Sequence, residues 1–293
     1  MNEAGATALT YASILAILTS GPDDAVVLSA GAQFVRGQGG EVRAMLALPA
    51  VSSLMFSVGM SGGYVSQEIV ALIQQANDDA RRKTEALVCE TSKREGLTLD
   101  AADGRIVLLP ERSMAESDML GETPLCDLII VGQSTFKSLG LWSGLVSGAL
   151  MQARLPFYIA RRVAPEHGVA AIAWDGSQGA GRAVRAALPL LTAASKVVLL
   201  QDADHISATD RLAADLTSLG AYLKLHGVKN ILAVSQSGLS RGGGLGAAAR
   251  QARADVLIAG AFSHARAMEA LFGGATDDML LQPAGDFNLL LVH

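Results

Sequence analysis

A strand-to-loop junction occurs twice in this chain, and it constrains the fold more than any other feature of the sequence. Asp127-Leu-Ile-Ile-Val-Gly132 in the first half and Asp255-Val-Leu-Ile-Ala-Gly260 in the second share an acidic start, an apolar run and a closing glycine. A polar loop and a glycine-containing helical segment follow each copy. The two closing glycines lie 128 residues apart, about the length of one small domain. We therefore expect one structural unit in two copies.

Apolar periodicity predicts the same order of elements in both halves. Strands are predicted at 14–18, 41–48, 105–109, 128–131 and 157–161, and again at 169–174, 196–200, 230–235, 256–259 and 288–292. Helices are predicted at 23–36, 67–95, 181–194 and 208–226. Strands that alternate with helices imply a parallel sheet with right-handed crossovers. The predicted fold class is therefore α/β, with two tandem Rossmann-like domains, each a five-stranded parallel sheet flanked by helices.

The boundary between the halves is expected in the segment Arg161-Arg-Val-Ala-Pro-Glu-His-Gly168, which is polar and carries a proline. This gives a first domain at 1–163 and a second at 164–293. The stretch Pro49 to Gly63 is rich in Ser, Gly and Met and has no counterpart of similar length in the second half. A loop of this length is either an insertion or a lid over the first cleft, and we favour a variable insertion.

Composition excludes several classes of protein. Half of the residues are hydrophobic and only 4% are aromatic, which suits parallel strands covered by alanine-rich helices. The net charge of −5 is spread without a long run of one sign, so no nucleic-acid surface is expected. Two cysteines and five scattered histidines offer no disulfide framework and no metal site. No uncharged apolar run reaches the roughly 18 residues that span a bilayer, so we expect a soluble, cytoplasmic protein.

Ligands of open parallel sheets bind beyond the carboxyl ends of the strands. In the second half Asp175 stands directly after the first strand and is followed by Gly176 and Ser177. A carboxylate at this point can accept hydrogen bonds from a base or a ribose. Asp175 or Ser177 can equally cap the following helix, and the two interpretations are compatible.

The run from Gly260 to Thr276 leaves a strand on one glycine and carries two more at Gly273 and Gly274. Backbone amides at such turns form nests for anions, because glycine allows a close approach and a positive φ. The run is therefore a candidate phosphate-binding loop, although glycines also serve plain turns.

Two of these segments resemble motifs of the universal stress protein family. Trp174-Asp175-Gly176-Ser177 resembles the family's first strand, which ends in Asp-Gly-Ser, and Asp255 to Gly260 resembles its Asp-Leu-Ile-Val-Met-Gly strand. The family's phosphate motif is Gly, two residues, Gly, nine residues, Gly, then Ser or Thr. Gly260 and Gly273 match this motif, Ser263 replaces its second Gly, and Gly274 stands where the hydroxyl residue belongs.

Thr276, two residues further on, is the candidate replacement for that hydroxyl. The resemblance covers nearly the whole chain as two concatenated copies, and it implies the adenine nucleotide alpha hydrolase-like fold. The candidate cofactor-binding residues that it implies are Asp175, Gly260, Ser263, Gly273, Gly274 and Thr276.

The first half departs further from the family. Thr19-Ser20-Gly21 stands in place of Asp-Gly-Ser, so the carboxylate on the adenosine side is missing. Gly132 is kept, Thr135 replaces the second Gly, and Gly144 falls one position early and is followed by Leu145. The first site is therefore expected to be degenerate, and a nucleotide would bind in the second half.

The resemblance implies a tandem universal stress protein that acts in stress response by binding a ligand or a partner. ATP or AMP is the expected ligand, although each missing glycine adds a Cβ near the phosphate and weighs against tight binding. No catalytic residue is expected, and any ATP hydrolysis would be slow. The two halves are expected to pack through their last strands as an intramolecular pseudo-dimer, which leaves a homodimer open.

A second hypothesis comes from a different class of protein. The glycine-rich segment Gly238-Leu-Ser-Arg-Gly242-Gly-Gly-Leu-Gly246 follows a predicted strand and precedes a helix, as a dinucleotide-binding loop does. Its spacing is not that of the Gly-x-Gly-x-x-Gly fingerprint. The alternative is a Rossmann-like protein that binds flavin or NAD and is related to electron-transfer flavoproteins.

Overall fold

The chain divides into two compact units. The computed structural model describes residues 10–48, 66–97, 104–110, 120–137, 154–205, 215–239, 244–260 and 287–292. The N-terminal unit is Ala12–Ala153, and the C-terminal unit is Arg154–His293 together with Met1–Tyr11. The domains 1–163 and 164–293 stay a prediction that rests on the sequence repeat. The segment from Pro49 to Gly63 lies outside the described residues.

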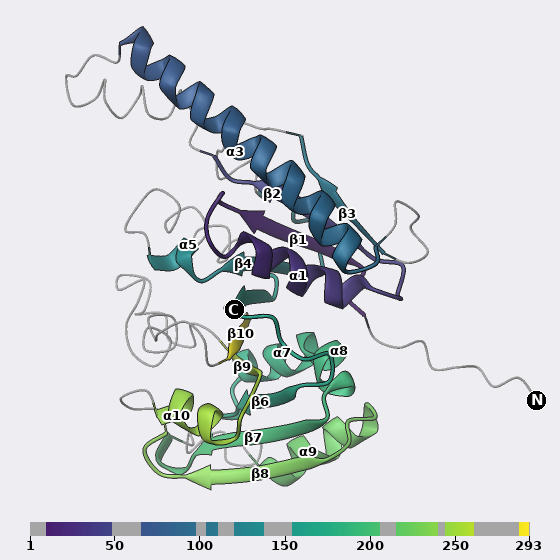
Figure 1. Ribbon diagram of the computed structural model, residues 1–293. Coiled ribbons are helices and arrows are strands. Elements are labelled where there is room, and N and C mark those ends of the chain that lie inside the picture. The colour runs from purple at the N-terminus through teal and green to yellow at the C-terminus, as the bar shows by residue number, and fades with distance from the viewer. Residues whose placement is uncertain are drawn as a thin grey trace, which may run out of the picture. The chain divides into compact units, whose positions relative to one another are not determined.

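The N-terminal unit is a parallel sheet covered by helices (Figure 1). Its described elements are β1 (Ser13–Leu18), α1 (Asp24–Val35), β2 (Glu41–Leu46), α3 (Gln67–Arg94), β3 (Arg105–Leu108), β4 (Leu128–Gly132) and α5 (Ser134–Lys137). Within the described part of this unit, the strand order is β3-β2-β1-β4. The first strand of the unit therefore lies inside the sheet, between β2 and β4.

The central strands of this sheet are apolar on both faces. In β1 every residue after Ser13 is buried, and β4 is buried along its whole length. Such continuous apolar runs are typical of parallel strands with helices on both sides. The core of the unit therefore lies on β1 and β4, where α1 also packs.

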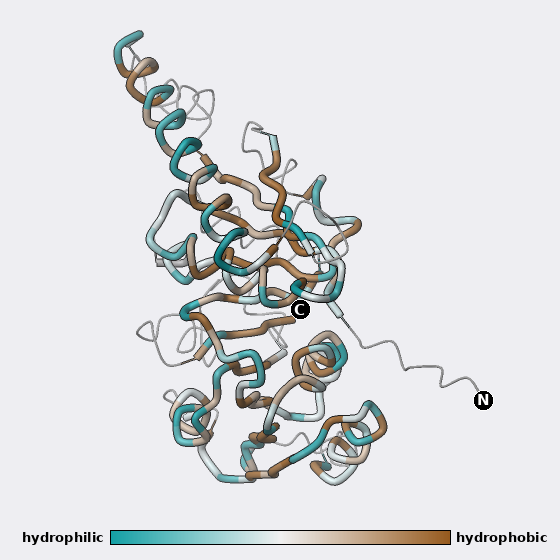
Figure 2. The backbone as a smooth tube through the Cα atoms, turned by 45° about the vertical axis from the view of Figure 1, so that its right-hand side comes forward, coloured by the Kyte–Doolittle hydropathy of each residue, from teal (hydrophilic) through white to brown (hydrophobic). Residues whose placement is uncertain are grey.

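Helix α3 is 28 residues long and buries few of its side chains. The Ser66 hydroxyl accepts a hydrogen bond from the Ile69 amide and begins the helix, and Lys93 and Arg94 lie in its last turn. In Figure 2 this helix, at the top of the view, alternates between teal and brown along its length. Arg94 donates a hydrogen bond to the Ser29 hydroxyl of α1 at 2.6 Å, which fixes the end of α3 to the unit.

The C-terminal unit repeats this arrangement. Its described elements are β5 (Phe157–Ala160), β6 (Val169–Ala173), α7 (Gln178–Ala186), α8 (Leu188–Ala193), β7 (Lys196–Asp202), the short 3-10 helix η1 (Ala203–His205), α9 (Leu216–Leu225), β8 (Ile231–Gln236), α10 (Gly244–Gln251), β9 (Val256–Gly260) and β10 (Asn288–Val292). The strands β10-β9-β6-β7-β8 run parallel in this order, and β5 pairs with β10 in the antiparallel direction. The predicted α/β class, with parallel strands flanked by helices, is confirmed.

The helix predicted at 181–194 was wrong in its extent. The structure begins α7 at Gln178, where the Ser177 hydroxyl accepts a hydrogen bond from the Ala180 amide, and separates α7 from α8 at Ala187. Pro189 stands in the first turn of α8, where its missing amide costs nothing. A proline inside one continuous helix would remove a hydrogen bond, so the chain starts a new helix instead.

The helix predicted at 208–226 is described only in part. Helix α9 begins at Leu216, because the Asp215 carboxylate accepts hydrogen bonds from the amides of Thr217 and Ser218. Residues 206–214 lie outside the described part of the chain. Across the described residues, no helix combines the length and the apolar character that a membrane span requires.

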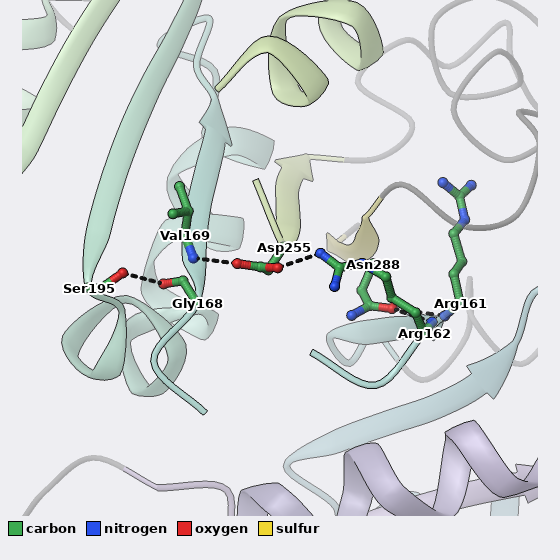
Figure 3. Close-up of polar contacts among 7 residues, drawn as sticks. All are labelled: Arg161, Arg162, Gly168, Val169, Ser195, Asp255 and Asn288. Carbon is green, nitrogen blue, oxygen red and sulfur yellow. Dashed lines mark hydrogen bonds and ion pairs between the residues drawn. The ribbon is translucent and has the colours of Figure 1, made fainter. Parts of the chain in front are cut away.

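A partly buried polar cluster joins β5 to β9 and β10 at the amino ends of β9 and β10 (Figure 3). The side-chain oxygen of Asn288 accepts hydrogen bonds from the amides of Arg161 and Arg162 at 2.8 and 3.1 Å. The Asp255 carboxylate accepts from the Val169 amide at 2.7 Å and forms an ion pair with Arg162. We call Arg161, Arg162, Asp255 and Asn288 the β5–β10 cluster. A ligand is expected at the carboxyl ends of the parallel strands, and the cluster lies at the opposite edge of the sheet.

Candidate functional site

The turn after β6 places the Asp175 carboxylate at the carboxyl edge of the C-terminal sheet. Asp175 is exposed, and its Oδ1 accepts a hydrogen bond from the Ser177 amide at 2.9 Å. Gly176 between them has a φ of 79°, which favours glycine. The Ser177 hydroxyl then accepts from the Ala180 amide at 3.1 Å and caps α7. Asp175 therefore shapes the turn, Ser177 caps the helix, and the carboxylate stays accessible at the edge of the sheet.

Gly260 ends β9 against the first turn of α7. A Cβ atom at Gly260 would lie 2.6 Å from the carbonyl carbon of Gly179 and 2.7 Å from the amide nitrogen of Ala180. Because both of these atoms are backbone, no side chain fits at Gly260 without a shift of the helix or the strand. The end of β9 thus lies beside the N-terminus of α7, where the helix dipole favours negative charge.

The structure brings two of the six predicted residues to one edge of the sheet. Asp175 follows β6 and Gly260 ends β9, and these two strands are paired neighbours. Ser263, Gly273, Gly274 and Thr276 lie outside the described residues, so their roles stay predictions. Sequence reasoning missed Gly179, which lies against Gly260. Gly179 lies near Gly260 because β6, which leads into α7, is paired with β9. A single sequence does not reveal this pairing.

Asp202 at the end of β7 is a second acidic group on this edge, and the loop that it opens was expected to face a ligand together with Asp175 and Gly260. It is 7% exposed, and its Oδ1 accepts hydrogen bonds from the amides of Asp204 and Gly238 at 3.0 and 3.1 Å. Gly238 opens the glycine-rich segment on which the flavin or NAD alternative depends. A carboxylate beside this segment opposes the pyrophosphate that the alternative needs there. Packing alone explains the glycine at position 244, because a Cβ there would lie 2.8 Å from the Leu239 carbonyl oxygen.

The corresponding turn of the N-terminal unit also has a residue with positive φ, but its chemistry differs. Ser20 has a φ of 55° at the position where Gly176 of the second turn has 79°, and Thr19 stands where the carboxylate is expected. The carboxylate of Asp24 folds back on this turn and accepts a hydrogen bond from the Thr19 amide at 3.1 Å. Next to it, the Asp23 carboxylate accepts from the Ser134 amide at 2.6 Å. Two aspartates of this unit therefore occupy the edge where the resemblance would have a ligand.

Burial raises the pKa of Asp24 above its ordinary value of 3.8, against the hydrogen bonds from the amides of Thr19, Ser20 and Gly21 that favour the charged form. The folded chain therefore holds the Asp24 proton more tightly than the unfolded chain does. Stability from this group is complete below pH 3.8 and is lost as the pH rises through the raised pKa. The pKa of Asp215 is lowered by hydrogen bonds from the Thr217 amide and from Ser218. Stability from Asp215 is therefore present above pH 3.8 and is lost as the pH falls through the lowered pKa.

We expect Asp24→Asn and Asp215→Asn to change the pH dependence of stability in opposite directions. The stability of the wild type relative to Asp24→Asn should fall as the pH rises from 3.5 to 7, since only the wild type must ionise a buried group. Relative to Asp215→Asn it should rise over the same range, because the ionised cap forms the better hydrogen bonds. Urea unfolding at a series of pH values measures both differences. Equal slopes for the two variants would contradict the assignment.

The described residues contain no cluster of three His, Cys, Asp or Glu side chains placed to hold a metal ion. What this edge offers a ligand is therefore an exposed carboxylate, a helix N-terminus and a strand end without a side chain.

Comparison with known proteins identifies the fold. No family model matches the chain, and no curated protein matches it in sequence. Among solved structures, a universal stress protein of Archaeoglobus fulgidus is similar over 95% of this chain and 95% of its own, with a TM-score of 0.66 and 14% identity. A chain from Pseudomonas aeruginosa, also described as a universal stress protein, covers 96% of this chain and 93% of its own, with a TM-score of 0.53 and 14% identity. The chain has the fold of the universal stress proteins.

Proposed function

We propose that the chain is a tandem universal stress protein that acts in stress response by binding, and that ATP or AMP binds at the carboxyl edge of its C-terminal unit. The observation that carries this proposal is the close approach of Gly260 to Gly179 beside the exposed Asp175 carboxylate. At no other paired strand end that the structure describes do a bare glycine, a helix N-terminus and an exposed aspartate come together.

Each part of this edge suits a different part of a nucleotide. The Asp175 carboxylate can accept hydrogen bonds from ribose hydroxyls or from the amino group of adenine. The first amides of α7 and the bare backbone at Gly260 favour phosphate, since helix N-termini and glycine turns bind anions. Ser263, Gly273, Gly274 and Thr276 would complete the phosphate loop, as the resemblance implies. The role is binding, so no catalytic residue is assigned and hydrolysis would be slow.

The pairing of β5 with β10 supports the pseudo-dimer. These are the last strands predicted for the two sequence halves, and they pair in the antiparallel direction. A homodimer of two such chains is a separate part of the proposal, because the pairing of β5 with β10 lies within one chain.

Nucleotide binding is tested with two matched variants at the first turn of each half. We expect one equivalent of ATP or AMP to bind per chain, and Asp175→Ala to weaken binding about tenfold, the equivalent of about 1.4 kcal/mol for a hydrogen bond to a charged group. Thr19→Ala changes the corresponding position of the first half and should leave affinity unchanged. Isothermal titration calorimetry on the three full-length proteins measures this.

Equal losses in both variants would place the site elsewhere, and the absence of any binding would refute the nucleotide proposal. Native mass spectrometry of the purified protein gives an independent check. A copurified flavin or NAD would instead favour the alternative at Gly238 to Gly246.

A further inference from the structure

Two pairs of positions correspond between the units and can be compared directly. In the strand registers, Ile14 lies beside Leu128 as Ala170 lies beside Val256, so equivalent strands are aligned residue by residue. This alignment makes Gly132 the counterpart of Gly260. Counted from β1 and β6, it makes Asp23 the counterpart of Gly179.

Each pair brings the end of the fourth strand close to the start of the first helix, through the Asp23 side chain in one unit and through backbone in the other. A Cβ at Gly132 would lie 2.5 Å from the Cβ of Asp23, just as a Cβ at Gly260 would lie 2.6 Å from the carbonyl carbon of Gly179. Each unit therefore presses the end of its fourth strand against the start of its first helix. The difference is that the C-terminal unit has hydrogen at both positions, and the N-terminal unit has a carboxylate at one of them.

The Asp23 side chain does not cap its own helix. An aspartate at an N-cap usually accepts a hydrogen bond from an amide in the first turn that follows, but Asp23 makes no such bond. Its Oδ2 instead accepts from the amide of Ser134, two residues beyond Gly132. This amide is the first of α5, directly after the fourth strand, and the proposed function assigns the segment that follows the fourth strand of the other unit to phosphate.

We propose that Asp23 decides which of the two units takes phosphate, because its carboxylate stands in the N-terminal unit where a phosphate oxygen would bind. This inference rests on the proposed function for the identity of the loop. The Asp24 carboxyl group, 5% exposed and bonded to the Thr19 amide, adds a second acidic side chain on the same turn. The side chains of Asp23 and Asp24 thus exclude anions from the N-terminal unit. A unit that binds no phosphate does not need the glycines of the motif, and the N-terminal unit has Thr135 in place of the second one.

Exchanging the residues at this position tests the inference in both directions. Asp23→Gly gives the N-terminal unit the glycine of its counterpart and should create a site for inorganic pyrophosphate, with at least a tenfold gain in affinity at that unit. A change in the chemical shift of the Ser134 amide on titration, measured by NMR on the full chain, assigns the gain to this loop. Asp23→Ala removes the same carboxylate with a better helix former, and serves if Asp23→Gly does not fold.

The reciprocal change is Gly179→Asp, with Gly179→Asn as a control of the same size and no charge. A Cβ at Gly179 meets its nearest atoms at 3.7 and 3.8 Å, which is ordinary contact, and the two side chains have nearly the same size, so any packing cost is shared by both variants. We expect Gly179→Asp to lower the affinity of the C-terminal unit for pyrophosphate at least tenfold more than Gly179→Asn does.

The two proposals fail in different ways. If the wild type binds neither ATP nor pyrophosphate, the proposed function fails, while a pyrophosphate site gained by Asp23→Gly with a shifted Ser134 amide still supports the role of Asp23. A folded Asp23→Gly or Asp23→Ala protein that gains no site overturns the inference. So does equal binding by the Asp and Asn variants at Gly179 in a chain that does bind pyrophosphate.

Discussion

Gly260→Ala is expected to lower the free energy of unfolding of the C-terminal unit by about 3 kcal/mol, although it adds only one methyl group. The new Cβ would lie 2.6 Å from the carbonyl carbon of Gly179 and 2.7 Å from the Ala180 amide nitrogen. Neither atom can rotate away as the end of a side chain can, so β9 or the first turn of α7 must move. The cost follows from overpacking, since Gly260 has no positive φ that alanine would have to avoid.

The matched control is Gly220→Ala, in α9 of the same unit. A Cβ at Gly220 meets nothing within 4 Å, and alanine favours a helix interior over glycine by about 1 kcal/mol, so this variant should be more stable than the wild type. In a Trp142→Phe background, Trp174 is the only tryptophan left of the two in the chain and reports the unfolding of the C-terminal unit in urea. A Gly260→Ala protein as stable as the wild type would show that the close approach is absent.

Because Gly260→Ala is expected to lower the free energy of unfolding, Asp175 is the better position for a test of nucleotide binding. A variant at Gly260 changes the fold and the site together, so weakened binding would have two explanations. Asp175 is exposed, and its Oδ1 accepts a hydrogen bond from the Ser177 amide within its own turn. Its replacement therefore separates the ligand contact from the packing of the strand end.

The strands could be predicted closely because each is a short apolar run that ends in residues typical of turns. The strand predicted at 128–131 is β4, Leu128–Gly132, and the strand predicted at 288–292 is β10, Asn288–Val292. Helix ends were less certain, since they depend on capping and on proline. The separation of α7 from α8 at Ala187 follows from Pro189, which the apolar periodicity alone did not weigh.

The candidate site could be predicted only where one residue carries the signal. Asp175 follows its strand directly, and Gly260 ends a repeated motif, so the sequence singles out both, and their roles in binding stay predictions. Gly179 and Asp23 were missed because their importance comes from a neighbour more than 80 residues away along the chain. The missing carboxylate at Thr19 was correctly noted, but local sequence gives no sign that Asp24 would fold back onto that turn.

The two units differ in chemistry at the carboxyl end of the fourth strand and agree at its amino end. Both units keep the acidic residue before that strand, since the Asp127 carboxylate accepts from the Ser13 amide as Asp255 accepts from the Val169 amide. These aspartates align the fourth strand with the first and serve the fold. Beside the carboxyl end of this strand stands Asp23 in one unit and Gly179 in the other, so the two units differ at the edge proposed for a ligand and agree where the strands are aligned.

Asn288→Ala is expected to destabilise the C-terminal unit by a similar amount, about 3 kcal/mol, through the β5–β10 cluster. Asn288 is fully buried, and its side-chain oxygen accepts from the amides of both Arg161 and Arg162. Alanine would leave two backbone donors without this acceptor, and each orphaned donor costs about 1 to 3 kcal/mol. Phe287 and Arg161 also lie against each other here, with the guanidinium 5.6 Å from the ring centroid.

The consequence for β5 should be larger than for the rest of the unit. Only three residue pairs align β5 with β10, among them Tyr158 with Leu290, and a slip by one residue would turn every side chain of β5 to the other face. Burial raises the pKa of Tyr158, against a hydrogen bond with Asn288 that lowers it. Loss of that hydrogen bond alone would raise the pKa further, so a phenol that ionises at lower pH in Asn288→Ala would report a loosened pairing. Ser195→Ala, an exposed change near the same cluster, should cost less than about 0.5 kcal/mol in urea unfolding. If Asn288→Ala costs no more than this control, the pairing of the last strands is held by their apolar faces alone.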